Sequence, residues 1–168
     1  FYHYNDCKLA QLHEAKGLGK ASLGLLYMKL TKLCGFDWLK GEEWKVMGLA
    51  AYGKLNPALY DLLTKFIIVN NFDCTHPGEN VFVNLAKLDA FQAQPDSSLE
   101  ELADIAFTGQ QFFADVVTHL LSYLHRVTRS EQLTLAGGCA LNSSFNGKIT
   151  ELTGFNEVYI PPAPADDG

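Results

Sequence analysis

A glycine-rich segment in the last third of the chain has the composition of an anion-binding turn. Residues 133–142 read Leu-Thr-Leu-Ala-Gly-Gly-Cys-Ala-Leu-Asn, with Gly137 and Gly138 between an apolar stretch and a helix start. Glycines here let the main chain approach an anion closely, and free N–H groups at a helix start attract phosphate. A plain strand-to-helix turn fits the two glycines equally well. The segment lacks the lysine of a P-loop and the third glycine of the dinucleotide fingerprint.

A second segment, residues 41–53, reads Gly-Glu-Glu-Trp-Lys-Val-Met-Gly-Leu-Ala-Ala-Tyr-Gly. It has no clean helical or strand period, which predicts a loop and a short helix with an unusual backbone path. Lys45 is suited to pair with a phosphate. Trp44 could stack on a base or pack in the core, and the core is the better expectation for a lone tryptophan.

A third segment, residues 161–168, is a stiff proline-rich loop that ends in Asp166, Asp167 and Gly168. It follows a predicted strand, and ligands of open α/β sheets gather beyond the carboxyl ends of strands. A carboxylate there could bind a metal ion that bridges phosphate oxygens. Two acidic residues at a chain end are, however, more often simply solvated.

The remaining cysteines and histidines give no further site. Cys139 lies in the glycine-rich segment, where a helix N-terminus would lower the pKa of a thiol, but no histidine is fixed beside it by the sequence. We interpret it as a small residue that fills space. His119 and His125 are six apart on a predicted helix and so face different sides, which is not metal-ligand spacing.

Apolar periodicity predicts the helices that must position these segments. One helix begins at Ser22 and ends at Gly35, and a second covers residues 57–69 after an Asn-Pro start. The longest begins at Ser97 or Ser98, each of which offers a capping box, and its apolar stripe is wide enough to be buried against a sheet.

The other segments predict less regular structure. Residues 1–20 are expected to form a loop, and residues 70–96 an irregular excursion with one edge strand at 81–83. The last third predicts a strand at 132–135, a helix from Asn142 or Ser143 to about residue 152, and a parallel second strand at 158–160 joined by a right-handed crossover. Gly109 is expected to be a tolerated interruption that costs about 1 kcal/mol relative to alanine.

Composition narrows the class of protein. The chain has 168 residues, 48% hydrophobic and 19% charged, which suits a single packed unit. Its net charge of −6 without a basic stretch argues against nucleic acid as a partner. No apolar stretch reaches the roughly 20 residues of a membrane span. The four cysteines lack a C-x-x-C pair, so we expect reduced thiols in a cytoplasmic protein, with two disulfide bridges as the less favoured alternative.

In order along the chain, these segments resemble the O-carbamoyltransferase family of nodulation and antibiotic-tailoring enzymes. The similar stretches are residues 22–36, 41–53, 135–148 and 158–168, nearly the whole chain. The adenylating domain of that family is similar to the tRNA threonylcarbamoyl-adenosine synthase domain and shares the architecture of actin, sugar kinases and the Hsp70 ATPase. The resemblance implies an α/β fold, an actin-like ATPase lobe with a mixed sheet and packed helices.

The resemblance also implies ATP-dependent carbamoyl transfer. Carbamoyl phosphate and ATP would give carbamoyl-adenylate, whose carbamoyl group passes to a hydroxyl of a small-molecule acceptor such as a sugar. The implied nucleotide-binding residues are Gly137, Gly138, Ala140 and Asn142 along the phosphates, with Lys45 and Gly48 near the nucleotide. Asp166 matches the Asp of the family's Asp-x-Gly motif, which ligates a divalent metal, usually iron.

Two departures from the family pattern shape the prediction. The family's H-x-x-x-H metal histidines lie upstream of these segments, and no such pair occurs in the chain. The chain also stops at Gly168, where such enzymes continue into a C-terminal domain. We therefore expect an incomplete fragment, residues 1–168 of the ATPase-like N-terminal domain, which is inactive without the remaining parts of its parent chain. A tRNA threonylcarbamoyl-transferring protein and a non-catalytic nucleotide-binding module remain the alternatives.

Overall fold

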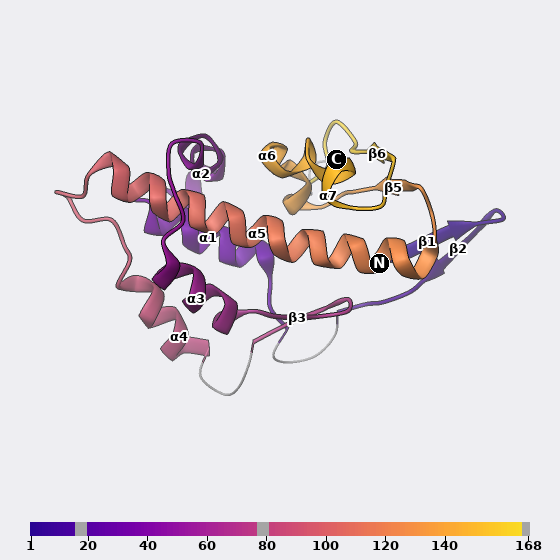
Figure 1. Cartoon of the computed structure of the whole chain (residues 1–168), viewed down its shortest axis with the longest axis horizontal. Helices are drawn as coiled ribbons and strands as arrows, with labels where there is room; N and C mark the ends of the chain where they lie inside the picture. The colour runs from indigo at the N-terminus through magenta and orange to yellow at the C-terminus, as the bar shows by residue number, and fades with distance from the viewer. Residues whose placement is uncertain (16–19, 77–80, 166–168) are drawn as a thin grey trace.

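A long helix forms the spine of the molecule (Figure 1). The computed structural model describes residues 1–15, 20–76 and 81–165. Helix α5, Leu99–Thr128, is 30 residues long. Helices α1 (Leu23–Leu33), α2 (Glu43–Ala50) and α3 (Pro57–Phe66) pack along it, and α4 (Val81–Asp89) packs on α3.

In the described residues, three small sheets accompany the helices, so the predicted α/β fold class is confirmed. Two are antiparallel hairpins, β1 (Tyr2–Asn5) with β2 (Lys8–Gln11) and β3 (Ile68–Asn70) with β4 (Asp73–Thr75). The third pairs β5 (Gln132–Thr134) with β6 (Glu157–Tyr159) in parallel. The short helices are η1 (Trp38–Lys40), η2 (Gly138–Leu141), α6 (Ser143–Asn146) and α7 (Ile149–Leu152). No helix of the described residues is long and apolar enough to cross a membrane.

The predicted helix starts are confirmed by their caps. The side chain of Ser22 accepts a hydrogen bond at the start of α1, and that of Asn56 accepts two at the start of α3. Ser98, and not Ser97, forms the capping box of α5. Gly35 follows α1 with φ of +79°, in the left-handed region that favours glycine. Local side-chain chemistry thus sets where the main helices begin and end.

The expected loop at residues 1–20 is wrong, because β1 and β2 form a hairpin there. Its two turn residues, Asp6 and Cys7, both have positive φ, of 50° and 60°. This backbone geometry usually comes with an Asn-Gly or Asp-Gly pair. Asn5 and Asp6 are common turn residues, but Cys7 stands where the strongest hairpin signal has glycine. The predicted helix at 57–69 likewise ends early, because its last residues enter the hairpin β3–β4.

The predicted edge strand at 81–83 is also wrong, because these residues begin helix α4. The run Val-Phe-Val favours a strand by local propensity alone. Leu88 is fully buried and Leu85, three residues before it, packs partly buried against the core, so the segment packs as a helix on α3. Tertiary packing here overrides the local preference.

Helix α5 is buried among helices rather than against the expected sheet. Gly109 is more than a tolerated interruption: a Cβ added there would lie 2.6 Å from Leu30 Cδ1 of α1. A Cβ at Gly53 would lie 2.0 Å from the carbonyl oxygen of Ala103, so the chain that leaves α2 touches the α5 main chain. Both glycines permit approaches that no larger residue allows.

The predicted parallel pairing of these two strands is confirmed, with Leu133 of β5 opposite Val158 of β6. The single helix expected from Asn142 or Ser143 to residue 152 is instead two short helices, α6 and α7, and the 3-10 helix η2 precedes them. Gly147 lies at the break, where a residue with poor helix propensity weakens a continuous helix. As a result, no long helix points its N-terminus at the glycine-rich segment.

Candidate functional site

The glycine loop, residues 136–142, leaves β5 through a backbone shape that only glycine adopts readily. Gly137 has φ of 98° and ψ of 166°. Its N–H donates to the carbonyl oxygen of Pro164 at 2.6 Å, and its own carbonyl oxygen accepts from the N–H of Ala140 at 2.9 Å. The first bond holds the loop against the segment that follows β6, and the second closes a turn within the loop itself.

Gly138 presents open main chain on the outer side of this loop. Gly137 and Gly138 are exposed, and a Cβ added at either would meet no described atom within 4 Å. The N–H groups of Gly138 and Cys139 donate to no described residue. The loop can therefore offer main-chain donors to an anion, although they come from a loop and a four-residue 3-10 helix and not from the expected helix start.

Ala140 and Asn142 face inward instead. Ala140 is buried, and Asn142 is 5% exposed. The Oδ1 atom of Asn142 accepts from the N–H of Phe145 at 3.0 Å, which caps α6. Its amide also exchanges two hydrogen bonds with the amide of Gln110, at 3.1 and 3.0 Å. These two predicted phosphate-lining residues thus lie on the inner side of the loop, where they hold its shape.

Gln110 is a site residue that sequence reasoning missed. Its Oε1 atom accepts from the hydroxyl of Tyr27 at 2.7 Å, so one side chain joins α1, α5 and the glycine loop. Burial raises the pKa of Tyr27 well above its ordinary value, and the phenol therefore remains a donor. The available signal was a polar residue between Ala106 and Phe113 at helical spacing, on an otherwise apolar stripe.

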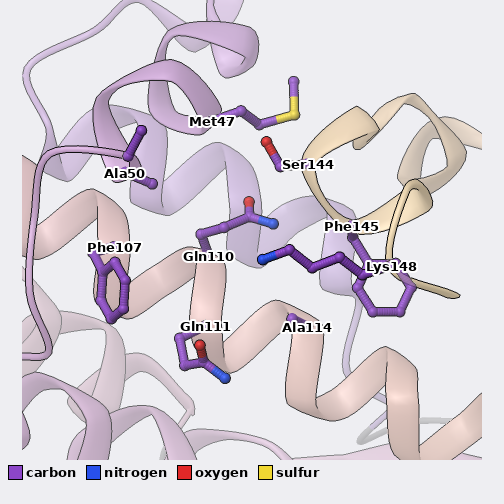
Figure 2. Close-up of a pocket in the computed structure, with 10 residues that line it drawn as sticks. Met47, Ala50, Phe107, Gln110, Gln111, Ala114, Ser144, Phe145 and Lys148 are labelled. Atoms are coloured by element: carbon purple, nitrogen blue, oxygen red, sulfur yellow. The ribbon is translucent and has the colours of Figure 1, made fainter. Parts of the chain in front are cut away.

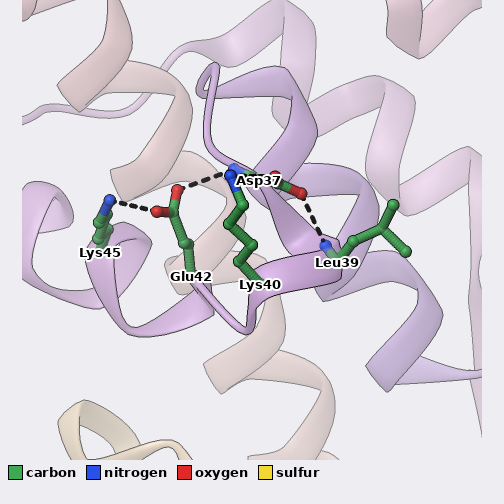
Figure 3. Close-up of polar contacts among 5 residues, drawn as sticks. All are labelled: Asp37, Leu39, Lys40, Glu42 and Lys45. Atoms are coloured by element: carbon green, nitrogen blue, oxygen red, sulfur yellow. Dashed lines mark hydrogen bonds and ion pairs between the residues drawn. The ribbon is translucent and has the colours of Figure 1, made fainter.

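Figure 3 shows how the second segment begins. The carboxylate of Glu42 accepts from the N–H of Asp37 at 2.9 Å and from Lys45 Nζ at 2.6 Å. The hydrogen bond from Lys45, followed by that from Asp37, lowers the pKa of Glu42. Lys45 Nζ also lies 5.5 Å from the ring centre of Phe36. Lys45 therefore has structural partners at the start of α2, where it was predicted to lie near a phosphate.

The expectation that Trp44 packs in the core is wrong, because the residue is 62% exposed. Gly48 is exposed too, and a Cβ added there would meet no described atom within 4 Å. Helical spacing puts Trp44, Met47, Gly48 and Ala51 on one face of α2. The missing side chain at Gly48 leaves open space on this face.

A pocket of about 330 Å³ lies between α2, α5 and α6 (Figure 2). Its lining residues are Met47, Ala50, Ala51, Phe107, Gln110, Gln111, Ala114, Ser144, Phe145 and Lys148. Figure 2 shows the amino group of Lys148 directed toward Gln110. None of the ion pairs among the described residues includes Lys148. The pocket is thus apolar on the α2 side and carries an unpaired cation at its other edge.

Two segments far apart in the sequence, residues 41–53 and 135–148, meet at this pocket. None of the predicted nucleotide-binding residues is among the residues that line the pocket. Two of them adjoin its lining: Gly48 follows Met47, and Asn142 bonds to Gln110. Their joint arrangement depends on packing around α5, which neither segment reveals alone.

The family model of the carbamoyltransferase N-terminus matches residues 3–168, which include both segments and the pocket. The chain belongs to this family. It is 32% identical over 98% of its length to an uncharacterized protein of Methanocaldococcus jannaschii and 30% identical over 88% to nodulation protein NolNO of Sinorhizobium fredii. It is also 34% identical over 88% to an uncharacterized protein of Synechocystis. The chain spans 27%, 21% and 26% of these three relatives, respectively.

Cys139 lies half-buried in this loop of a carbamoyltransferase-family chain, a position that suits the space-filling role expected of it. Burial raises the pKa of its thiol, which disfavours the nucleophilic thiolate. All four cysteines are free.

The metal-binding residue implied by the family, Asp166, lies outside the described residues. Within the described ranges no three His, Cys, Asp or Glu side chains come together as a metal-binding group. These residues therefore do not supply a ligand set for a metal on their own.

Proposed function

We propose that the chain is the nucleotide-holding part of an ATP-dependent O-carbamoyltransferase. The observation that carries the proposal is the meeting of residues 41–53 and 135–148 at one pocket, whose lining residue Gln110 bonds to Asn142 of the glycine loop. Family membership supports a carbamoyltransferase, and the geometry supports a ligand with an apolar body and an anionic tail.

In this proposal the two sides of the site have different tasks. The N–H groups of Gly138 and Cys139 bind phosphate oxygens, and Lys148 supplies positive charge from the pocket edge. Met47 and Ala51 form the wall against which the nucleoside lies. In the whole protein, water would convert carbamoyl phosphate to carbamate and phosphate, and the carbamate would displace pyrophosphate from ATP to give carbamoyl-adenylate. An acceptor hydroxyl would then take the carbamoyl group, with AMP as the leaving group.

We further propose that the chain belongs to an actin-like ATPase lobe, with the β5–β6 pair as part of its sheet. The chain covers 27% and 21% of two relatives, which supports a longer parent protein whose other parts complete the site. Asp166 remains the proposed metal ligand, and its partner ligands would come from elsewhere in that parent. The acceptor is a small molecule with a hydroxyl group.

The test uses the full-length parent protein with ATP and radiolabelled carbamoyl phosphate. We expect labelled carbamoyl-adenylate and measurable ATP affinity by titration calorimetry. Replacing Lys148 by methionine removes a charged donor and should raise the Kd for ATP about tenfold. The control is Lys65→Met, because Lys65 is exposed on α3 and pairs with Asp61.

Equal ATP affinity in the Lys148→Met and control proteins would remove the pocket from the nucleotide site. ATP binding without any carbamoyl-adenylate would instead favour the non-catalytic module. Threonylcarbamoyl transfer to tRNA by the parent protein would favour the other alternative.

A further inference from the structure

The side-chain amide of Gln110 is the central member of a hydrogen-bonded chain of three side chains that connects α1, α5 and the glycine loop. Oε1 accepts from the Tyr27 hydroxyl at 2.7 Å and from Asn142 Nδ2 at 3.0 Å. Nε2 donates to Asn142 Oδ1 at 3.1 Å. Tyr27 and Asn142 are 8% and 5% exposed, so water cannot readily replace a lost partner.

This chain fixes which way the amide of Asn142 points. Its Oδ1 atom receives the N–H of Phe145 as well as Gln110 Nε2. A flipped Asn142 would set an NH₂ group against both donors, which is unfavourable. The side chain of Asn142 is therefore held for the loop and for the cap of α6, and its effect on a ligand must pass through the loop main chain.

We propose that Gln110 is a positioning residue for the glycine loop, acting through Asn142 to hold the main-chain donors of Gly138 and Cys139 in their binding arrangement. This inference rests on the proposed nucleotide site. Gln110 lies on α5, a helix with many buried residues, and its Oε1 atom accepts a hydrogen bond from Tyr27 of α1. The loop thereby takes its position from the helical body and not only from its own short bonds.

The first test replaces Gln110 by methionine, which has similar volume and no hydrogen-bonding amide, in the full-length parent protein. Two buried polar groups then lose a partner, and we expect the KM for ATP to rise about tenfold with a smaller change in kcat. The control is Gln94→Met, because Gln94 is exposed and its amide bonds only to the carbonyl oxygen of Gln92. Equal KM values for the two variants would overturn the proposal.

A double-mutant cycle with Asn142→Ala tests whether Gln110 acts through Asn142. Asn142→Ala alone should also weaken ATP binding, and adding Gln110→Met should then cost less than twofold more. Additive effects on ATP affinity would show that Gln110 acts by another route, and the positioning role would be abandoned.

Hydrogen exchange separates this inference from the proposed function. In the same variants without nucleotide, the main-chain N–H of Phe145 should exchange about threefold faster with Gln110→Met than with Gln94→Met. Its acceptor Asn142 Oδ1 is then released, while its 3.1 Å bond to the Asn142 carbonyl oxygen remains. If the wild-type parent binds no ATP, the proposed function fails while this exchange difference still supports the positioning of the loop. Unchanged exchange at Phe145 would contradict the positioning whatever the protein binds.

Discussion

The two adjacent glycines of the loop have different physical roles. Gly137 occupies a backbone region with φ of 98° and ψ of 166° that is strained for any other residue. Gly138 has no positive φ, and its Cα faces open space. The first glycine is therefore required by the fold of the loop, whereas the second, in the proposed site, leaves the main-chain donors accessible to a ligand.

This division predicts distinct results for two alanine substitutions. Gly137→Ala should lower the free energy of unfolding by about 1–3 kcal/mol, because the strained backbone no longer suits the residue. Gly138→Ala should change that free energy by less than about 0.5 kcal/mol but weaken ATP binding, because the new methyl group covers the main-chain donors. Urea unfolding and calorimetry measure the two effects. If both alanine variants bound ATP as tightly as the wild type, the proposed role of the loop would be wrong.

At the scale of elements, the start of α2 depends on one carboxylate. Because the pKa of Glu42 is lowered in the folded protein, the unfolded chain takes up the proton first as pH falls. The stabilisation by Glu42 is thus present above its ordinary pKa of 4.5 and is lost as pH falls through the lower folded value.

We therefore expect Glu42→Gln to reduce stability most above about pH 4.5, with the difference from wild type shrinking at lower pH. Urea unfolding from pH 7 to pH 3 measures this. In a Lys45→Met background the pH dependence should be smaller, because Lys45 is the main cause of the lowered pKa. A difference that grows toward low pH would show the assignment to be wrong.

Two helical glycines give a matched pair for the packing of α1 on α5. Gly109→Ala should destabilise the protein by about 1–3 kcal/mol, because Leu30 is fully buried and its methyl groups cannot move away. Gly48→Ala should stabilise it by about 0.5–1 kcal/mol, because α2 gains a better helix former in open space. Thermal unfolding compares them, and a stabilised Gly109→Ala protein would exclude close helix contact there.

Short-range signals account for what the sequence predicted among these elements. The caps at Ser22, Asn56 and Ser98 use side chains within three residues of the main-chain groups that they bind. The hairpin at Asp6 and Cys7 was missed because its turn lacks the usual glycine. The break of the last predicted helix at Gly147 was missed because a single glycine inside a helical pattern is often tolerated.

The candidate site was predictable only in its segments. The sequence located both stretches that meet at the pocket, but Gln110 and Lys148 acquire their positions from the packing of α2 and α6 around α5. Such long-range geometry leaves little trace at the level of spacing. Trp44 illustrates the same limit, since burial is decided by neighbours that are remote in sequence.

For the whole molecule, burial is concentrated around α5 and is low at the first hairpin. The fully or nearly buried residues in the middle of α5 are Phe112, Phe113, Val116, Val117, Leu120 and Leu121. In β1 and β2 most residues are exposed, including Tyr4 and Leu9. Stability should therefore be uneven along the chain.

Hydrogen exchange should reflect this distribution. We expect amides at 112–121 to exchange slowest, through global unfolding, and those of β1–β2 to exchange orders of magnitude faster, through local opening. Mass spectrometry of peptic peptides measures both. Equal protection of the hairpin and of α5 would mean that the molecule opens as one cooperative unit.

The contact at Gly53 restricts how this site can change during evolution or design. The carbonyl oxygen of Ala103 occupies the place of any side chain at position 53, so the chain after α2 is held against the main chain of α5. Variants selected for a different ligand cannot readily change the orientation of α2 relative to α5. A change in ligand selectivity must therefore come from substituting side chains on α2, while the orientation of the helix stays the same.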